Sequence, residues 1–309
     1  MTSLLSGPSN TLLSLIKADA SLQLCFRGKY FSVYYKGDSL FKISLSDRGG
    51  VAAFDFNHAR KTESWEISLK KLKGLGYAYF EGKGDVAKRS RKVIYRYRSE
   101  GKNLHDLRSF WEESIRILKP LVDDFLDLEK KYDYFKGSLV GRNSEHLERQ
   151  RQQQIMRANN SLKGEYFIYD MEYDQPRNSS VSEAKSGRFD MLALRRISTG
   201  RYSLVFIELK STPVACGGGS GIEKHRVDLE RYICNEKLIG VRKNDAVEIC
   251  RQYGELGLVE KEEVKVEGVE MLFVFTDKAM AHAGKIKNTW EKCILPGAEM
   301  GLKYNIMTL

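Results

Sequence analysis

The stretch that decides the fold of this chain is Ser203-Leu204-Val205-Phe206-Ile207-Glu208-Leu209-Lys210, an apolar run that ends in two opposite charges. An apolar run of this length is typical of a buried strand. Residues two apart on a strand point to the same face, so we expect Glu208 and Lys210 to project together. Charges at the end of a core strand are costly unless they are paired or hold a metal ion. The sequence therefore predicts a functional cluster at this strand end.

A second strand is predicted just upstream, at Gly187-Arg188-Phe189-Asp190-Met191-Leu192-Ala193-Leu194. Ser198-Thr199-Gly200 turns the chain between the two strands, which favours an antiparallel pair. Asp190 would then meet Glu208 and Lys210 from the neighbouring strand. The alternative interpretation is structural, with an ion pair at a strand end and Asp190 capping a turn.

The composition is that of an ordinary globular protein. The chain has 309 residues, of which 42% are apolar, and this length favours two domains. No stretch reaches the apolar length of a membrane span, and the N-terminal residues lack the pattern of a secretory signal. The five cysteines are scattered and form no CxxC pair, which argues against a disulfide framework or a zinc ribbon. We therefore expect a cytoplasmic protein with reduced thiols and no membrane partner.

Basic residues are in excess, with 51 Lys and Arg against 41 Asp and Glu. This balance suits a polyanionic partner such as nucleic acid, although many basic proteins bind none. The cations concentrate in one segment, in which Tyr95 and Tyr97 interleave with arginines: Lys83, Lys88, Arg89, Arg91, Lys92, Arg96 and Arg98. One interpretation is phosphate binding with stacking by the tyrosines. The other is a solvated edge strand that is protected by its charge.

The hydrophobic pattern changes along the first half of the chain. Up to about residue 100, β-formers predominate, and Lys36-Gly37-Asp38 is expected to form a hairpin turn. From residue 103, apolar residues recur at three- and four-residue steps, which predicts helices flanking Pro120, with Trp111 in the core. We expect a β-rich and helical N-terminal domain over residues 1–135, used for substrate recognition or sensing, and a second domain over residues 136–309.

The second domain is predicted to follow the order helix, strand, strand with Asp190, strand with Glu208 and Lys210, helix, strand. Asn143-Ser144 can cap the first helix, and a glycine-rich stretch, Gly217–Gly221, precedes the second. The elements around the two central strands are expected near residues 143–156, 165–173, 222–235 and 269–277.

This order and these residues resemble the PD-(D/E)xK nuclease superfamily over roughly residues 140–280, about half of the chain. Asp190 matches the aspartate of that family and Glu208-Leu209-Lys210 matches its (D/E)-x-K, while Phe189 replaces the nominal proline. The resemblance implies an α/β fold with a mixed central sheet flanked by helices, a restriction-endonuclease-like core. It also implies metal-dependent hydrolysis of nucleic acid, with DNA favoured over RNA, in restriction or antiviral defence. Endonuclease and exonuclease action both remain open.

The residues themselves suit this chemistry. Hydrolysis of a phosphodiester needs charge neutralisation on the phosphate and a deprotonated water in line with the leaving oxygen, and a hard divalent cation helps with both. Mg²⁺ prefers a few carboxylate oxygens together with waters. We therefore expect Mg²⁺, for which Mn²⁺ can substitute, on Asp190, Glu208 and the carbonyl of Leu209. Lys210 would lower the pKa of the attacking water or steady developing charge.

The resemblance points to further site residues on two helices. Family members often add an acidic residue from the first helix, where Glu145 is preferred here over Glu148. Many members also carry a glutamine on the later helix, with a tyrosine one or two turns on. His225 and Tyr232 stand in those places and are candidates for nucleic-acid contacts, with a structural histidine as the alternative. The remaining candidate contacts are Lys88, Arg89, Arg91, Lys92, Arg96 and Arg98.

Two other functions are compatible with the sequence. The first is a binding module or partner-recruiting subunit that keeps the nuclease scaffold without turnover. The second is a sensor-effector of antiviral defence, in which the N-terminal domain perceives a signal and releases the nuclease. A homodimer or a larger defence complex would be compatible with either.

Overall fold

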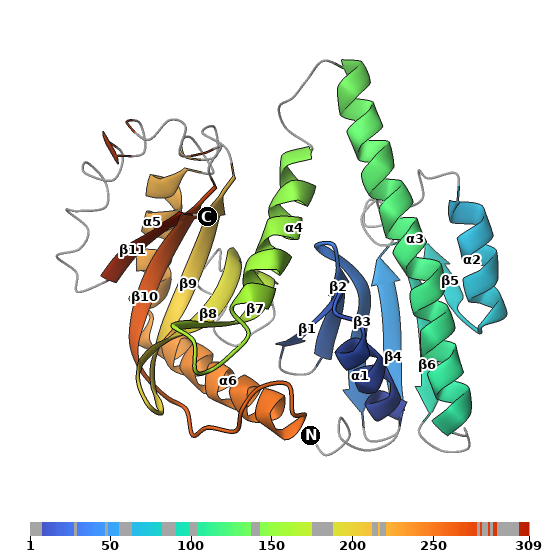
Figure 1. Ribbon diagram of the computed structural model, residues 1–309, viewed down its shortest axis with the longest axis horizontal. Helices are drawn as coiled ribbons and strands as arrows, with labels where there is room; N and C mark the ends of the chain where they lie inside the picture. Colours follow the sequence, from blue (N-terminus) through green and yellow to red (C-terminus); the bar gives the residue numbers. More distant parts are fainter. Residues whose placement is uncertain are drawn as a thin grey trace. The chain divides into compact units, whose positions relative to one another are not determined.

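The structure, a computed structural model, consists of two compact units, Met1–Gln153 and Gln154–Leu309, and it is of mixed α/β type (Figure 1). Each unit has its own sheet. The residues that the structure describes are 8–27, 30–46, 49–55, 64–81, 91–98, 104–136, 143–174, 188–211, 216, 221–276, 279, 284, 287–288 and 303–308.

Unit 1 is built on an antiparallel six-stranded sheet with the order β1-β2-β3-β4-β6-β5. Helices α1 and α3 lie across one face of this sheet (Figure 1), and α2 packs against α3. The strands are β1 (Leu22–Arg27), β2 (Tyr30–Tyr35), β3 (Asp38–Ser46), β4 (Gly49–Asp55), β5 (Ala78–Glu81) and β6 (Arg91–Arg98). The helices are α1 (Pro8–Ala18), α2 (Trp65–Gly74) and α3 (Leu104–Lys136).

The core of unit 1 lies between the sheet and these helices. Phe41 and Ile43 of β3 are fully buried, and the ring of Phe41 meets the edge of Trp111 on α3 with 5.7 Å between the centroids. Trp111 is itself fully buried, so the prediction that it belongs to the core is confirmed.

Helix α3 is a single helix of 33 residues with Pro120 inside it, so the expectation of separate helices on either side of this proline is wrong. An interior proline removes one hydrogen-bond donor and presses on the preceding turn. Leu118, Leu121 and Val122 around it are 0–3% exposed. Most of the stability of a protein helix comes from such tertiary packing of its apolar face, and here the packing outweighs the local cost of the proline.

Strand β6 lies between β4 and β5, so the interpretation of this basic segment as an edge strand is wrong. Strand β4 pairs with the whole of β6, whereas β5 pairs only with Arg91–Ile94. Lys83, Lys88 and Arg89 lie outside the described residues. The register of β6 therefore decides on which face of the sheet each of its cations falls.

The β2–β3 hairpin turns at Lys36 and Gly37, where the sequence predicts it. Both residues have a positive φ, 49° and 85°, as in a type I′ turn. The N–H of Gly37 donates to the buried side chain of Gln153 on α4 (Asn143–Ala158) at 2.6 Å. Because this part of α4 packs with the hairpin, the division between the units falls after Gln153, within the helix, rather than at residue 135.

Unit 2 contains a mixed five-stranded sheet with the order β11-β10-β9-β8-β7. Strands β7, β8 and β9 form an antiparallel meander, and β10 and β11 then run parallel to β9. The strands are β7 (Tyr166–Asp174), β8 (Arg188–Ser198), β9 (Arg201–Lys210), β10 (Lys265–Phe275) and β11 (Lys303–Thr308). Two helices, α5 (Ile222–Ile233) and α6 (Glu236–Glu255), connect β9 to β10, and the sequence predicts only the first of them.

Helices α5 and α6 cover the same face of the unit 2 sheet. Tyr232 of α5 packs on Phe206 of β9, and Tyr253 of α6 packs on Phe167 of β7. The strand registers place Phe167 and Phe206 on one face of the sheet. In the described part of the chain, no helix has both the length and the apolar character needed to cross a bilayer.

The contact of the hairpin with α4 can be tested at Gly37. Gly37→Ala should lower the free energy of unfolding by more than about 2 kcal/mol, because the φ is positive and the added Cβ would lie 2.6 Å from the backbone of Arg149. Gly240→Ala in α6 is the control, since nothing lies within 4 Å of its added Cβ. It should raise stability by about 0.5–1 kcal/mol. Urea unfolding followed by circular dichroism measures the free energy of unfolding of both variants. Equal effects of the two substitutions would contradict the contact between the hairpin and α4.

Candidate functional site

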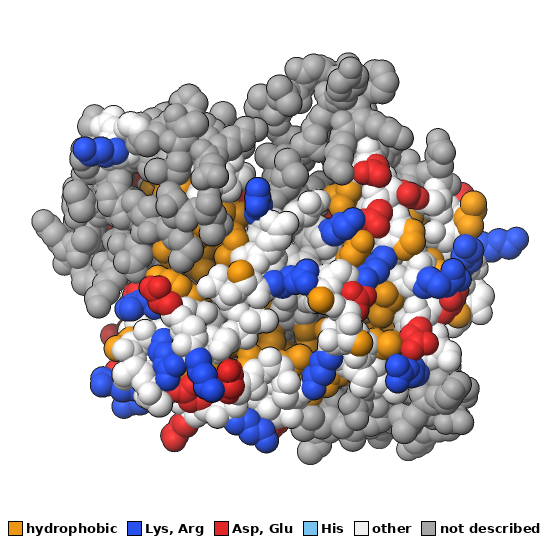
Figure 2. Space-filling view, viewed as in Figure 1, with side chains coloured by type: hydrophobic (Ala, Val, Ile, Leu, Met, Phe, Trp, Pro, Cys, Tyr) orange, Lys and Arg blue, Asp and Glu red, His pale blue; other side chains and the backbone are white. Residues whose placement is uncertain are grey.

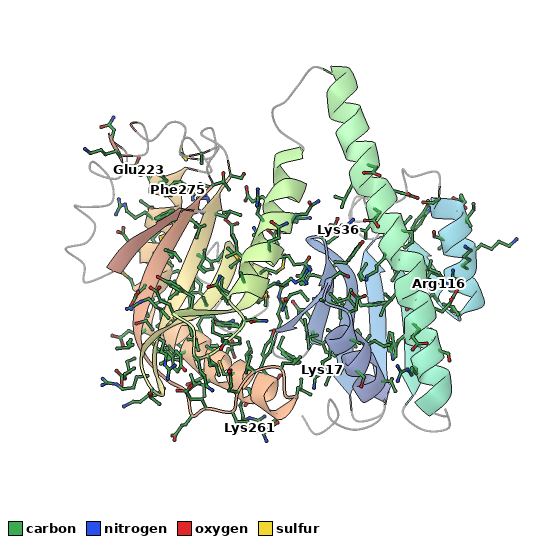
Figure 3. The ribbon with its side chains drawn as sticks, in the orientation of Figure 1. Lys17, Lys36, Arg116, Glu223, Lys261 and Phe275 are labelled. Atoms are coloured by element: carbon green, nitrogen blue, oxygen red, sulfur yellow. The ribbon has the colours of Figure 1, made fainter. Side chains whose placement is uncertain are left out.

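The candidate site lies at the carboxyl end of β9, where Lys210 pairs with Phe275, the last residue of β10. Figure 3 places Phe275 and Glu223, which lies in the first turn of α5, at the same end of unit 2, with Lys261 at the opposite end. The ends of two parallel strands and the start of the following helix therefore meet here. Ligands of open α/β sheets commonly bind at such strand ends.

Glu208 and Lys210 project to the same face of the sheet, as their spacing requires. The Nζ of Lys210 lies 3.3 Å from Oε2 of Glu208, and the two residues are only 3% and 1% exposed. Strand β9 is buried over nearly its whole length before it reaches them. The pair is thus an ion pair of the interior, where a partner is required for each charge.

His225 of α5 approaches the same oxygen. Its Nδ1 lies 3.0 Å from Oε2 of Glu208, while Oε1 accepts no hydrogen bond from any residue that the structure describes. Helix α5 returns antiparallel to β9, so that Tyr232 meets Phe206 and His225, two turns earlier, meets Glu208. Both nitrogen donors therefore converge on one carboxylate oxygen. The sequence indicates His225 as a contact for nucleic acid and misses its role beside Glu208.

The charge state of Glu208 follows from these contacts. Burial raises the pKa of the carboxyl group, but Lys210 and His225 lower it by more, so its pKa lies below the ordinary value of 4.5. Glu208 is therefore a carboxylate at neutral pH. A buried carboxylate with one oxygen held by nitrogen donors can offer its other oxygen to a cation.

Asp190 reaches the cluster through the backbone of β9. Its Oδ2 accepts the N–H of Leu209 at 2.7 Å. Backbone pairing of β8 with β9 ends at the pair Met191 and Ile207, so the carboxylate takes the place of a ladder partner at the strand end. Asp190 therefore lies beside the residue that separates Glu208 from Lys210.

The carbonyl of Leu209 faces the same side as Asp190. The neighbouring carbonyl of Lys210 accepts the N–H of Thr276 on the β10 side of the strand. Successive backbone groups of a strand point to opposite sides, so the carbonyl of Leu209 points toward β8. The carbonyl of Leu209 and the side chain of Asp190 thus lie on the same side of β9, the side of β8.

Near Asp190, the side chains of β8 do not alternate regularly between the two faces of the sheet. Leu192 pairs with Phe206 and shares its face, and alternation would place Phe189 on the other face. The ring of Phe189 instead lies 4.6 Å from that of Phe206 and 5.3 Å from that of Tyr232. This break accompanies the turn of the Asp190 side chain toward Leu209.

The donor atoms at the site suit a hard divalent cation. Within the described residues, no three His, Cys, Asp or Glu side chains lie close enough together to hold a metal ion. The oxygen donors that lie at the strand end are the carboxylates of Asp190 and Glu208 and the carbonyl of Leu209. Mg²⁺ commonly takes one or two carboxylates and completes its shell with water and substrate oxygens, and this set fits that pattern.

Tyr232 lies in other surroundings than the sequence suggests, whereas the role of the two candidate glutamates stays a prediction. Tyr232 is 1% exposed, packs against Phe189 and Phe206, and is a core residue in this structure. Glu145 and Glu148 belong to the part of α4 that is grouped with unit 1. The side chain of Glu145 lies outside the description, and Glu148 is half-buried.

The basic excess of the chain belongs to unit 1. This unit has 28 Lys and Arg against 19 Asp and Glu, whereas unit 2 has 23 against 22. On the described surface in view in Figure 2, basic and acidic side chains are interspersed. The candidate contacts Arg91, Lys92, Arg96 and Arg98 lie on β6, and nothing is described of their side chains. The candidate site therefore sits in a nearly neutral unit.

Comparisons of the chain with models of protein families, with curated proteins and with solved structures found no match. The chemistry of the site follows from its residues and their geometry.

The lowered pKa of Glu208 predicts how this residue contributes to stability at acidic pH. A carboxyl group with a lowered pKa in the folded state stabilises above its unfolded pKa and loses that contribution as pH falls. The stability of the wild type relative to Glu208→Gln should therefore be largest at pH 6–7 and decrease below about pH 4.5. Urea unfolding of both proteins between pH 3 and pH 7 measures this difference. A difference independent of pH would contradict the ionised, paired state.

Proposed function

We propose that unit 2 is the catalytic part of a metal-dependent nuclease of the PD-(D/E)xK type, which hydrolyses phosphodiester bonds of nucleic acid, with DNA as the favoured substrate. The observation that carries the proposal is the convergence of Lys210 and His225 on one oxygen of the buried Glu208, beside Asp190. The sheet supports it, because an antiparallel meander followed by a helical crossover to a parallel strand is what a restriction-endonuclease-like core requires.

The residues of the proposed site have two roles, which are binding of a cation and stabilisation of the charge that develops during the reaction. Asp190, Glu208 and the carbonyl of Leu209 would hold Mg²⁺ or Mn²⁺, which when bound neutralises phosphate charge and makes water more acidic. His225 keeps the carboxylate of Glu208 in one orientation. The ammonium group of Lys210 lies in a site closed to bulk water, where it stabilises the charge that develops on an attacking oxygen or on the phosphate.

The cysteines support the cytoplasmic location that is part of the proposal. None of the described cysteines Cys25, Cys216, Cys234 and Cys250 forms a disulfide. Free thiols suit a reducing compartment, in which DNA is also accessible.

Replacement of the central pair tests the proposal. Glu208→Gln and Lys210→Ala should each lower Mg²⁺-dependent cleavage of circular and linear DNA at least about 100-fold, because cation binding or charge stabilisation is lost. Arg201→Ala is the control, because Arg201 is an exposed cation at the other end of β9, paired with Glu267. Cleavage of both substrates is followed on gels, with and without Mg²⁺.

Wild-type activity in Glu208→Gln and Lys210→Ala, both with native circular dichroism, would overturn the nuclease proposal. Binding of DNA without any metal-dependent cleavage by the wild type would favour a catalytically silent binding module instead.

His225 provides an independent test of the geometry. His225→Ala should lower kcat about 10-fold or more with little change in KM, because Glu208 loses one of its two orienting donors. His225→Asn, whose amide can donate to the same oxygen, should recover part of the rate. Steady-state cleavage kinetics measure both variants. Equal losses in the two variants would show that hydrogen bonding to Glu208 is not the function of His225.

A further inference from the structure

The position of Lys210 depends on how the end of β9 is held, because Lys210 is the last residue of this strand. On the β8 side, backbone pairing with β9 ends at Met191 and Ile207, before the strand reaches Lys210. On the β10 side, the last pair joins Lys210 to Phe275, which is also the last residue of β10. Lys210 therefore lies at the point where the second of the two ladders also stops.

A small movement of this strand end would separate the charged groups of the site. The Nζ of Lys210 lies 3.3 Å from Oε2 of Glu208, toward the long end of hydrogen-bond distances. The ammonium group is carried on a flexible alkyl stem, so the stem alone does not fix its position. Local opening of a protein costs least at the ends of its elements. The backbone of Lys210 thus needs support beyond its last ladder pair.

Thr276, the residue that follows β10, supplies this support. Its N–H donates to the carbonyl of Lys210 at 3.2 Å, which extends the hydrogen bonding between β9 and β10 by one residue. Its hydroxyl donates to the carbonyl of Ser211, the residue after Lys210, at 2.9 Å. One residue therefore holds two successive carbonyls at the end of β9.

The hydroxyl of Thr276 has a third partner, which connects it to the core. Its oxygen accepts the N–H of Ala279 at 3.4 Å, and Ala279 is fully buried. A hydroxyl can donate one proton and accept at its lone pairs, so both bonds can form together. The side chain of Thr276 thus ties the chain that leaves β9 to the chain that follows β10.

These contacts require the hydroxyl group and not only the shape of the side chain. Valine has a similar shape and is well suited to extended backbone. It would keep the backbone bond to Lys210, but it would deprive the carbonyl of Ser211 and the N–H of Ala279 of their bonds to the hydroxyl. Serine would keep all three bonds.

We propose that Thr276 is a positioning residue of the proposed nuclease, which fixes the end of β9 through its hydroxyl and so holds the ammonium group of Lys210 against Glu208. The side chain of Thr276 acts on backbone groups and not on the reacting atoms. The hydrogen bonds do not depend on the proposed function, whereas their effect on cleavage rests on it. Loss of such supporting hydrogen bonds typically lowers activity about 10- to 100-fold.

Steady-state kinetics of Mg²⁺-dependent DNA cleavage test this role. Thr276→Val should lower kcat about 10-fold and change KM less than about 2-fold, because the position of Lys210 is disturbed rather than substrate binding. Thr276→Ser should retain most of the wild-type rate. Thr199→Val is the matched control and should cleave like the wild type, because Thr199 lies in the turn at the other end of β9, where its hydroxyl accepts from Arg196.

A double-mutant cycle shows whether Thr276 acts through Lys210. In the Lys210→Ala background, Thr276→Val should lower the remaining rate less than about 2-fold, because the group that it positions is absent. Equal losses in both backgrounds, or a loss in Thr276→Ser as large as in Thr276→Val, would overturn the positioning role. Unchanged kcat in Thr276→Val beside an active wild type would overturn it as well.

Amide hydrogen exchange gives a readout that needs no cleavage. Exchange of the N–H groups of Leu209 and of residue 276 should be about 10-fold faster in Thr276→Val than in the wild type, and unchanged in Thr276→Ser, because the end of β9 opens more often. Equal exchange in the wild type and Thr276→Val would overturn the support of β9 by the hydroxyl. Faster exchange in Thr276→Val, together with a wild type that does not cleave DNA, would overturn only the nuclease proposal.

Discussion

The buried carboxylate of Glu208 is the constraint on which the rest of unit 2 depends. An unpaired carboxylate in a protein interior costs several kcal/mol, so the surrounding elements must supply partners in fixed positions. Lys210 does so from the same strand face, and His225 does so from α5. The position of His225 depends in turn on the aromatic contact between Tyr232 and Phe206, which fixes α5 along β9. The packing of the core therefore determines the geometry of the site.

Convergence on a single oxygen gives this cluster its chemical character. A structural ion pair would use the lone pairs of both oxygens, because each unsatisfied acceptor in the interior costs free energy. Here Oε2 has both nitrogen donors, whereas Oε1 has none among the described residues. Asp190 and the carbonyl of Leu209 lie at the same strand end. The proposed cation site rests on this grouping of oxygen atoms at the strand end.

The two units differ in net charge, and this difference suits two separate functions. Unit 1 has nearly all of the net positive charge of the chain, while unit 2 is almost neutral. Capture of a polyanion depends on an extended field of cations, whereas hydrolysis depends on a few groups in a site closed to water.

The sequence predicts those features of the fold that arise from local periodicity. The two-residue period puts Glu208 and Lys210 together, and positive-φ residues at Lys36 and Gly37 form the expected turn. The sequence does not predict the features that depend on pairing between residues far apart in the chain. The neighbours of β6 are set by the register of the whole sheet, and the turn of Asp190 toward Leu209 depends on a break in alternation.

Tertiary packing explains the remaining differences. Pro120 carries a strong local signal to end a helix, but burial on both sides of it keeps α3 continuous. The sequence suggests that Tyr232 contacts nucleic acid at the surface. The side chain of Phe189 packs against it instead, and Tyr232 is buried in the core. Helix α6 carries apolar residues at helical spacing (Ala246, Ile249, Cys250 and Tyr253), which is a signal that the sequence analysis misses, and its contacts with β7 and β10 stabilise it.

Binding of Mn²⁺ in solution is the decisive test of a cation site at Asp190 and Glu208. Electron paramagnetic resonance reports the free ion during a titration of the wild type and of Asp190→Asn, without any substrate. We expect a Mn²⁺ site in the wild type that Asp190→Asn weakens at least about 10-fold, because one of two carboxylate ligands is lost. Equal binding by both proteins, or no binding by the wild type at millimolar Mn²⁺, would contradict a cation site at Asp190 and Glu208.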